Sequence, residues 1–377
     1  MIRLMIALAL AAGAGPALAQ ERSGTPSAAG EAWTRTEGQL RFAPAGVTLP
    51  ERAGTTAVTE TSEFSHHGER LDNVVQYRSA DGEVIGTVYI YYPALAHTGL
   101  AAFATDNAIR ISSASEVASR GIRVVAAGDF PRAALRADYG NYRNGYASTA
   151  AFIKVGRWLI KLRVSAPERR REEVEGAMTA LLDGIGFEGS SPREAAPLEV
   201  GPCAAPAPAA ARRLPADMEA AADGVGVASF DGGGNPATGP RGESTVMRPR
   251  VPARWCVSTR ARIGDGVYPI LRAAAGQEGG LEGTSRAAVI VSDSGGLLEV
   301  VELRTGGRFV VLFHQIGQTA VLGSFAAVPS DQQIADIISG ADREGANTLA
   351  RVNFRPGRVD EVELIAPQQR PATEPVT

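Results

Sequence analysis

Alternation of hydrophobic and polar residues along the chain predicts β-strands as its main element. Two runs rich in β-branched and aromatic residues, 74–78 and 84–92, flank Asp81-Gly82, a dipeptide that favours a hairpin turn. Further strand-like runs follow between residues 122 and 164. A second series lies between residues 254 and 366, with glycine-containing turns between its members.

The strand expected over residues 158–164 has two unlike faces. Its even-numbered residues, beginning with Trp158, are all apolar, whereas Lys161 and Arg163 occupy odd-numbered positions. We expect a helix to cover Trp158 and Lys161 to face solvent. A lysine buried beneath a helix costs several kcal/mol unless it is paired.

Apolar residues at a spacing of three and four predict the helices. They are expected over residues 99–111, over residues 167–185, near residues 215–222, and after Ser330, where Gln333 completes a capping-box pattern.

These elements predict an α+β fold of two domains, each a mainly antiparallel sheet with one or two packed helices. The expected divisions are a signal peptide (1–19), a disordered segment (20–39), a first domain (40–187), a Pro/Ala-rich linker (188–213), a β-rich second domain (214–367) and a disordered tail (368–377).

The first twenty residues have the pattern of a secretory signal. Arg3 precedes an apolar run from Leu4 to Ala12 that is too short to span a bilayer, and Ala17-Leu18-Ala19 forms a small-residue cleavage site. No later stretch is apolar over the length that a membrane helix needs. We therefore expect cleavage after Ala19 and a soluble periplasmic or secreted protein.

The chain has two cysteines, Cys203 and Cys256. In an oxidising compartment we expect them to form a disulfide, which would close a loop of about 54 residues and contribute about 4 kcal/mol less any strain. Two separate buried thiols are the alternative. Neither cysteine has a further cysteine or a histidine at zinc-ligand spacing, so no metal is expected.

The charge balance does not favour anionic partners. The 377 residues carry a net charge of −3, and only two of the 38 basic residues, Lys154 and Lys161, are lysines. This balance gives no electrostatic reason to expect binding to nucleic acid or to an anionic membrane surface.

The order of elements in residues 40–190 resembles the Mog1/PsbP-like α/β/α sandwich. The likeness lies in the early hairpin ending in TVYIYYP, the helix after it, and the strand GRWLIKLRVSAP that continues into a final helix. The resemblance implies that fold and a mostly non-catalytic role. It transfers no functional residue.

Candidate catalytic and ligand motifs are incomplete. Asp293-Ser294-Gly295-Gly296 is similar to a serine-protease nucleophile motif, but the upstream histidines lie in the other expected domain, so a local turn is the simpler interpretation. Adjacent His66 and His67 would point to opposite faces of a strand and could not easily chelate one ion. The glycine-rich loop at 231–242 lacks the end of a P-loop. We expect no catalytic set, metal or cofactor.

Tyrosines and basic residues suggest one binding surface. Tyr89 and Tyr91 share a face of their strand, and Lys161 and Arg163 share a face of theirs. Tyrosine and arginine are enriched where a protein binds a partner, although tyrosine also suits strands in general. We expect these four residues to form a ligand or partner face.

The sequence thus indicates an exported partner-binding or scaffolding protein without catalysis, whose partner is a protein or small ligand of the cell envelope. A hydrolase with a site assembled only in three dimensions, or a carrier of a small ligand or lipid, remains the alternative.

Overall fold

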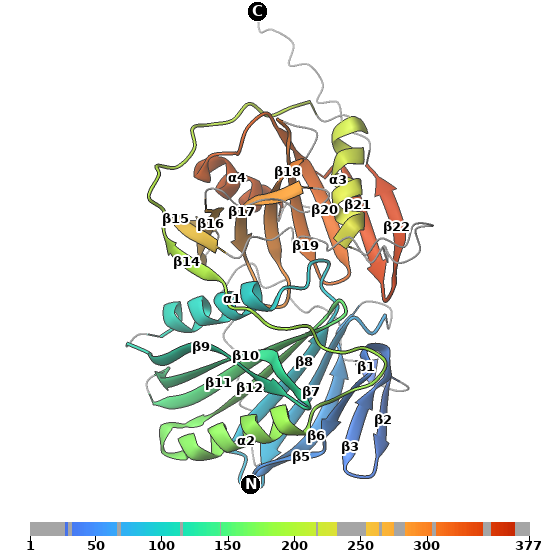
Figure 1. Ribbon diagram of the computed structural model, residues 1–377, viewed down its shortest axis with the longest axis vertical. Coiled ribbons are helices and arrows are strands. Elements are labelled where there is room, and N and C mark those ends of the chain that lie inside the picture. Colours follow the sequence, from blue (N-terminus) through green and yellow to red (C-terminus); the bar gives the residue numbers. More distant parts are fainter. Residues whose placement is uncertain are drawn as a thin grey trace, which may run out of the picture.

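The computed structural model describes residues 27–28, 32–65, 69–113, 116–143, 145–215, 218–231, 254–263, 266–274, 283–303, 307–341 and 348–365. The expected signal peptide, the His66-His67 pair, residues 232–242 of the glycine-rich loop and the expected C-terminal tail lie outside these ranges. Figure 1 shows two large sheets stacked along the long axis of the molecule, with one helix between them.

The first large sheet is antiparallel throughout, in the order β1-β6-β7-β8-β12-β11-β10-β9, with β5 paired to β6. Its strands are β1 (Ser27–Ala28), β5 (Arg52–Ala53), β6 (Thr56–Glu63), β7 (Asp72–Ser79), β8 (Ile85–Tyr91), β9 (Ala118–Ala127), β10 (Phe130–Tyr142), β11 (Tyr146–Val155) and β12 (Trp158–Pro167). Helix α1 (Thr98–Ile111) covers the face toward the second sheet, and α2 (Arg171–Gly184) covers the opposite face.

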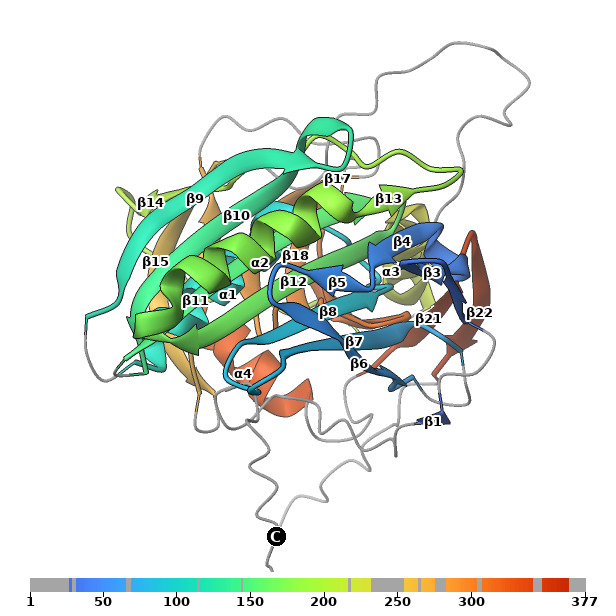
Figure 2. The same cartoon turned by 90° about the horizontal axis from the view of Figure 1, so that it is seen from below.

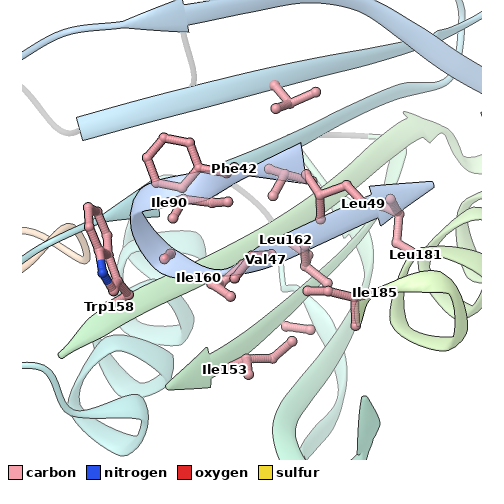
Figure 3. Packing of buried hydrophobic residues seen from close by; sticks show 14 of the residues in the cluster. Phe42, Val47, Leu49, Ile90, Ile153, Trp158, Ile160, Leu162, Leu181 and Ile185 are labelled. Carbon is pink, nitrogen blue, oxygen red and sulfur yellow. The ribbon is translucent and has the colours of Figure 1, made fainter. Parts of the chain in front are cut away.

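A small sheet shares the α2 face (Figure 2). It consists of β2 (Trp33–Thr36), β3 (Gln39–Phe42), β4 (Val47–Pro50) and β13 (Gly186–Phe187). Trp158 is buried there as predicted, but its ring packs against Phe42 of β3, with ring centres 5.5 Å apart, rather than beneath the helix (Figure 3). The expectation of disorder up to residue 39 is wrong from Ala32 onward, because β2 and β3 form a hairpin that closes this core.

The second large sheet is an antiparallel meander with one parallel strand, β14, at its edge. Its strands are β14 (Glu199–Pro202), β15 (Arg254–Ile263), β16 (Gly266–Ala273), β17 (Gly283–Ile290), β18 (Leu297–Leu303), β19 (Phe309–Gln315), β20 (Gln318–Phe325), β21 (Ala350–Arg355) and β22 (Arg358–Leu364). Helix α3 (Met218–Asp231) packs on one face and α4 (Asp331–Ala341) on the other. The α+β class is therefore correct, with strands predominating.

Helix α4 begins with the predicted capping box. The Gln333 backbone N–H donates to Ser330 Oγ at 3.3 Å, and the Ser330 backbone N–H donates to Gln333 Oε1 at 3.0 Å. The same Gln333 side chain also holds the backbone of Ala211, which belongs to the predicted linker. No helix in the described residues is both long and apolar enough to cross a membrane.

Backbone hydrogen bonds hold the predicted linker and its end against both large sheets. The Ala195 N–H donates to the Arg132 carbonyl at 2.8 Å, and the Leu214 N–H donates to the Ser324 carbonyl at 2.9 Å. Between these points, β14 pairs with β15, and the predicted disulfide joins Cys203 to Cys256. The segment therefore makes more contacts with both sheets than its composition predicts.

Helix α3 approaches β20 through a glycine. A Cβ on Gly224 would lie 2.3 Å from Val321 Cγ1, whereas a Cβ on Gly226 would have no neighbour within 4 Å. We expect Gly224→Ala to destabilise the fold by about 1–2 kcal/mol, because the overpacking outweighs the gain in helix propensity. Gly226→Ala should instead stabilise it by about 1 kcal/mol. Urea unfolding of both variants checks the difference in sign, and equal effects would contradict this packing.

Candidate functional site

The four predicted face residues lie on one side of the first sheet. Lys161 pairs across the ladder with Tyr89, and Leu159 pairs with Tyr91, so these side chains share the α1 face with Arg163. The second large sheet lies on this same side (Figure 1). The face therefore has an inner part, which meets the second sheet, and an outer part beyond it.

The inner part is closed by an ion pair. Lys161 is 7% exposed, so the expectation that it faces solvent is wrong. Its ammonium group binds the Asp293 carboxylate, which the turn before β18 contributes from the second sheet. Asp293 thus supplies the partner that makes burial of the lysine acceptable. Tyr91 is also buried here, and its hydroxyl donates to the Asp293 carbonyl at 2.5 Å.

Asp293 is held as a carboxylate. Burial alone would raise its pKa, but the Lys161 ammonium group and a hydrogen bond from Thr105 Oγ1 at 2.7 Å together hold the pKa below its usual value. The motif 293–296 forms the turn that the sequence predicts, and its aspartate also ties α1 and β12 to the second sheet.

Backbone hydrogen bonds join the two sheets beside this pair. The Ala94 N–H donates to the Gln315 carbonyl at 2.8 Å, and the Gly317 N–H donates to the Tyr92 carbonyl at 2.9 Å. Pro93 and Ile316 form a bridge between them. The segment after β8 therefore pairs directly with the β19–β20 turn.

His97 lies at the same junction without forming a serine–histidine pair. It lines a cavity of about 20 Å³ with Ser292 and Asp293, enough for about one water molecule. Its Nδ1 accepts the Leu100 N–H at 3.2 Å as the N-cap of α1. In the neutral ring the proton therefore sits on Nε2, so the ring has no free lone pair with which to activate a serine.

Protonation of His97 should weaken the fold. Burial, followed by the charge of Lys154, lowers the pKa of His97 to about 4. The unfolded state, with a pKa near 6.5, gains the proton first, so stability is lost as pH falls from about 6.5 to about 4. We expect about 2 kcal/mol of loss, allowing for partial exposure of the ring.

His97→Asn provides the measurement, because asparagine keeps an N-cap acceptor and does not titrate. Urea unfolding at pH 7 and pH 4.5 should show a smaller loss in the variant than in the native chain. The same loss in both proteins would contradict the role given to His97.

The outer part of the face remains partly open. Tyr89 and Arg163 are half-buried, and Arg143 is exposed. The Tyr142 ring contacts two guanidinium groups, with Arg163 Cζ at 5.1 Å and Arg143 Cζ at 5.4 Å from the ring centre. These are cation–π distances. Neither guanidinium has a carboxylate within 4 Å among the residues that the structure describes.

The turn between β10 and β11 places Arg143. Asn141 and Arg143 both have left-handed backbone conformations, with φ of 54° and 45°. Such conformations are costly for residues other than glycine and persist only where the surroundings impose them. Here Glu168 Oε2 accepts the Asn141 N–H at 3.2 Å, and Asn141 Nδ2 donates to the Glu116 carbonyl at 3.3 Å.

Two exposed apolar side chains lie at this end of the first sheet. Tyr146, 37% exposed, is paired with Tyr142 across the hairpin. Ile111, 46% exposed, ends α1 shortly before Glu116. We call Tyr89, Tyr142, Arg143, Tyr146 and Arg163 the tyrosine–arginine surface. It includes two of the four predicted residues, Tyr89 and Arg163, whereas Tyr91 and Lys161 serve the junction.

A polar network in the second sheet is not evident from the sequence. His314 Nε2 lies 2.9 Å from Glu299 Oε2, and its Nδ1 lies 2.9 Å from Thr319 Oγ1. Ser285 Oγ donates to the other oxygen of Glu299. All four residues are fully buried, so His314 is a core histidine whose two ring nitrogens both have partners. The network lies on the face toward α3 and the first sheet.

The described residues hold no cluster of three or more histidine, cysteine, aspartate or glutamate side chains arranged to bind a metal ion. No protein-family model matches the chain, and no similar sequence was found among curated proteins.

Proposed function

We propose that this chain is an exported, non-catalytic binding protein and that the tyrosine–arginine surface contacts its partner. The observation that carries the proposal is the contact of Arg143 and Arg163 with the Tyr142 ring at the open end of a face that is otherwise closed by α1 and the second sheet. Tyrosine and arginine are the residue types that most often anchor protein interfaces.

Rigid support favours binding at this position. Tyr142 is 5% exposed and belongs to the core beneath α1, so its ring is fixed before any partner arrives. Arg163 extends from β12, a central strand that is paired on both sides. A preorganised contact surface loses little side-chain entropy on association. Tyr146, paired with Tyr142 across the hairpin, adds an exposed aromatic side chain.

Export is supported by the signal pattern and by the Cys203–Cys256 disulfide, which forms in oxidising compartments. We keep the division into two domains, residues 40–187 and 214–367 joined by residues 188–213, as part of this proposal. In it, the second domain closes the inner part of the face through Asp293 and leaves the outer part available.

Partner capture from an extracytoplasmic extract tests the function. The disulfide-bonded protein, an Arg143→Gln/Arg163→Gln variant and an Arg35→Gln/Arg52→Gln control are immobilised at equal amounts. Arg35 and Arg52 are exposed near the small sheet, away from the surface. A specific protein retained by the native chain and the control, and lost by the variant, supports the proposal. Equal retention by all three would contradict it.

A further inference from the structure

Resting on the proposed function, we infer that Arg143 and Arg163 form a clamp for carboxylate groups and that its occupant is an acidic peptide segment of the partner. The clamp consists of these two guanidinium groups and the Tyr142 ring that both of them contact. Arginine presents its donors as a planar fork that matches a carboxylate, and stacking on a ring leaves the edge of that fork free to donate.

The two arginines come from separate elements and converge on one ring. Arg163 extends from β12, and Arg143 lies in the turn after β10. The Tyr142 ring is buried, and both guanidinium groups contact it. These contacts limit how far apart the two positive charges can move. Two like charges held near one ring repel each other, and an anion between them removes that repulsion.

Three carboxylates near this end of the molecule are already engaged. Glu168 accepts Arg171 Nε at 2.8 Å and also the Asn141 N–H. Asp106 forms an i,i+4 pair with Arg110 at 2.8 Å. Asp293 binds Lys161. Asp293 also attracts Arg163 electrostatically, but no carboxylate of the described residues forms an ion pair with either guanidinium group of the clamp, so both groups can donate to a carboxylate of a partner.

The inner part of the same face already binds a carboxylate from a peptide turn. Lys161 Nζ lies 5.3 Å from the centre of the Tyr89 ring, and this amine holds the carboxylate of Asp293. The molecule thus already contains one site in which a cation next to a tyrosine ring binds a carboxylate from a turn. The clamp likewise has a tyrosine ring and cations, but no carboxylate of the described residues is bound there.

The neighbouring side chains favour a peptide over a free anion. Tyr146 and Ile111 are exposed apolar groups at the same end, and the residues flanking an acidic side chain could cover them. A small inorganic anion would leave both uncovered. Carboxylate and phosphate share the chemistry that the clamp offers, so the experiment compares the two directly.

The test titrates the disulfide-bonded full-length protein with N-acetyl-hexaglutamate amide and follows the arginine Nε–Hε resonances by NMR. The signals absent from Arg143→Gln and from Arg163→Gln assign the two groups. We expect both signals to shift on titration, and the double variant to bind about tenfold or more weakly. The Arg35→Gln/Arg52→Gln control should bind as the native chain does. Because Arg143 is exposed, Arg143→Gln alone keeps the test valid if the double variant misfolds.

Two further titrations complete the test. The matched hexaglutamine peptide should leave both signals unmoved, and inorganic phosphate should shift them less than hexaglutamate does at equal concentration. Equal hexaglutamate affinity in the native chain and the double variant would overturn the clamp. A response to phosphate alone would overturn the acidic peptide as its occupant. If hexaglutamate fails while partner capture still needs both arginines, the proposed function stands and the carboxylate clamp falls.

Discussion

Glu299→Leu is expected to lower the free energy of unfolding by about 4 kcal/mol, the largest effect of any single replacement considered for this chain. The substitution keeps a side chain of similar size but removes the acceptor for Ser285 and the partner of His314. Both groups would remain fully buried with an unmet hydrogen bond. Urea denaturation at pH 7 measures the loss.

Glu302→Leu is the matched control on the same strand. Glu302 pairs with Arg286, and both side chains are about one-third exposed, so removing this pair should cost less than about 1 kcal/mol. Similar losses of unfolding free energy in the two variants would show that burial of the network does not determine its contribution to stability.

Asp293→Ala is expected to destabilise the protein by about 3 kcal/mol, because it leaves the Lys161 ammonium group buried without a countercharge. Lys161→Met should cost only about 1 kcal/mol. In that variant the Asp293 side chain, 28% exposed, keeps some water and the Thr105 hydrogen bond. The effect of the pair therefore depends on which partner remains.

Thermal and urea unfolding of the two single variants and of Asp293→Ala/Lys161→Met measure this asymmetry. The double variant should be more stable than Asp293→Ala alone, because no buried charge remains. A larger loss for Lys161→Met than for Asp293→Ala would contradict the assignment of Lys161 as the more deeply buried partner.

Local pattern was sufficient for much of the fold. The alternation around Trp158 predicted the buried face of β12, and the Ser330–Gln333 spacing predicted the start of α4. The pairing of two cysteines in an oxidising context predicted the disulfide. Each prediction depends on neighbouring residues or on a choice among very few partners, so the sequence alone constrained it.

Long-range pairing was not accessible in the same way. Strand parity predicts that Lys161 faces solvent, because its partner Asp293 lies 132 residues away along the chain. Asp293 also stands in an Asp-Ser-Gly-Gly turn, and turn formation alone accounts for those residue types. Residues 32–39 were expected to be disordered because their own pattern is polar. Their order comes from Phe42 and its packing on Trp158, which no local window shows.

The candidate site was predicted in part for the same reason. Strand parity placed Tyr89 with Tyr91 on one strand and Lys161 with Arg163 on another, and the register between the strands puts both pairs on the same face of the sheet. Parity cannot show that α1 and the second sheet cover part of that face. It also cannot show that a tight turn brings Arg143 against Tyr142, because that contact depends on left-handed backbone at two residues other than glycine.

Site-specific photo-crosslinking in the native cell envelope tests most directly whether the tyrosine–arginine surface meets a partner. Benzoylphenylalanine replaces Tyr146 in one protein and Leu364 in another, where Leu364 is an exposed residue of the β22 edge in the second sheet. We expect a discrete crosslinked adduct from position 146 that Arg143→Gln/Arg163→Gln abolishes, and none from position 364. An adduct from position 364 alone, or one from position 146 that persists without the two arginines, would contradict it.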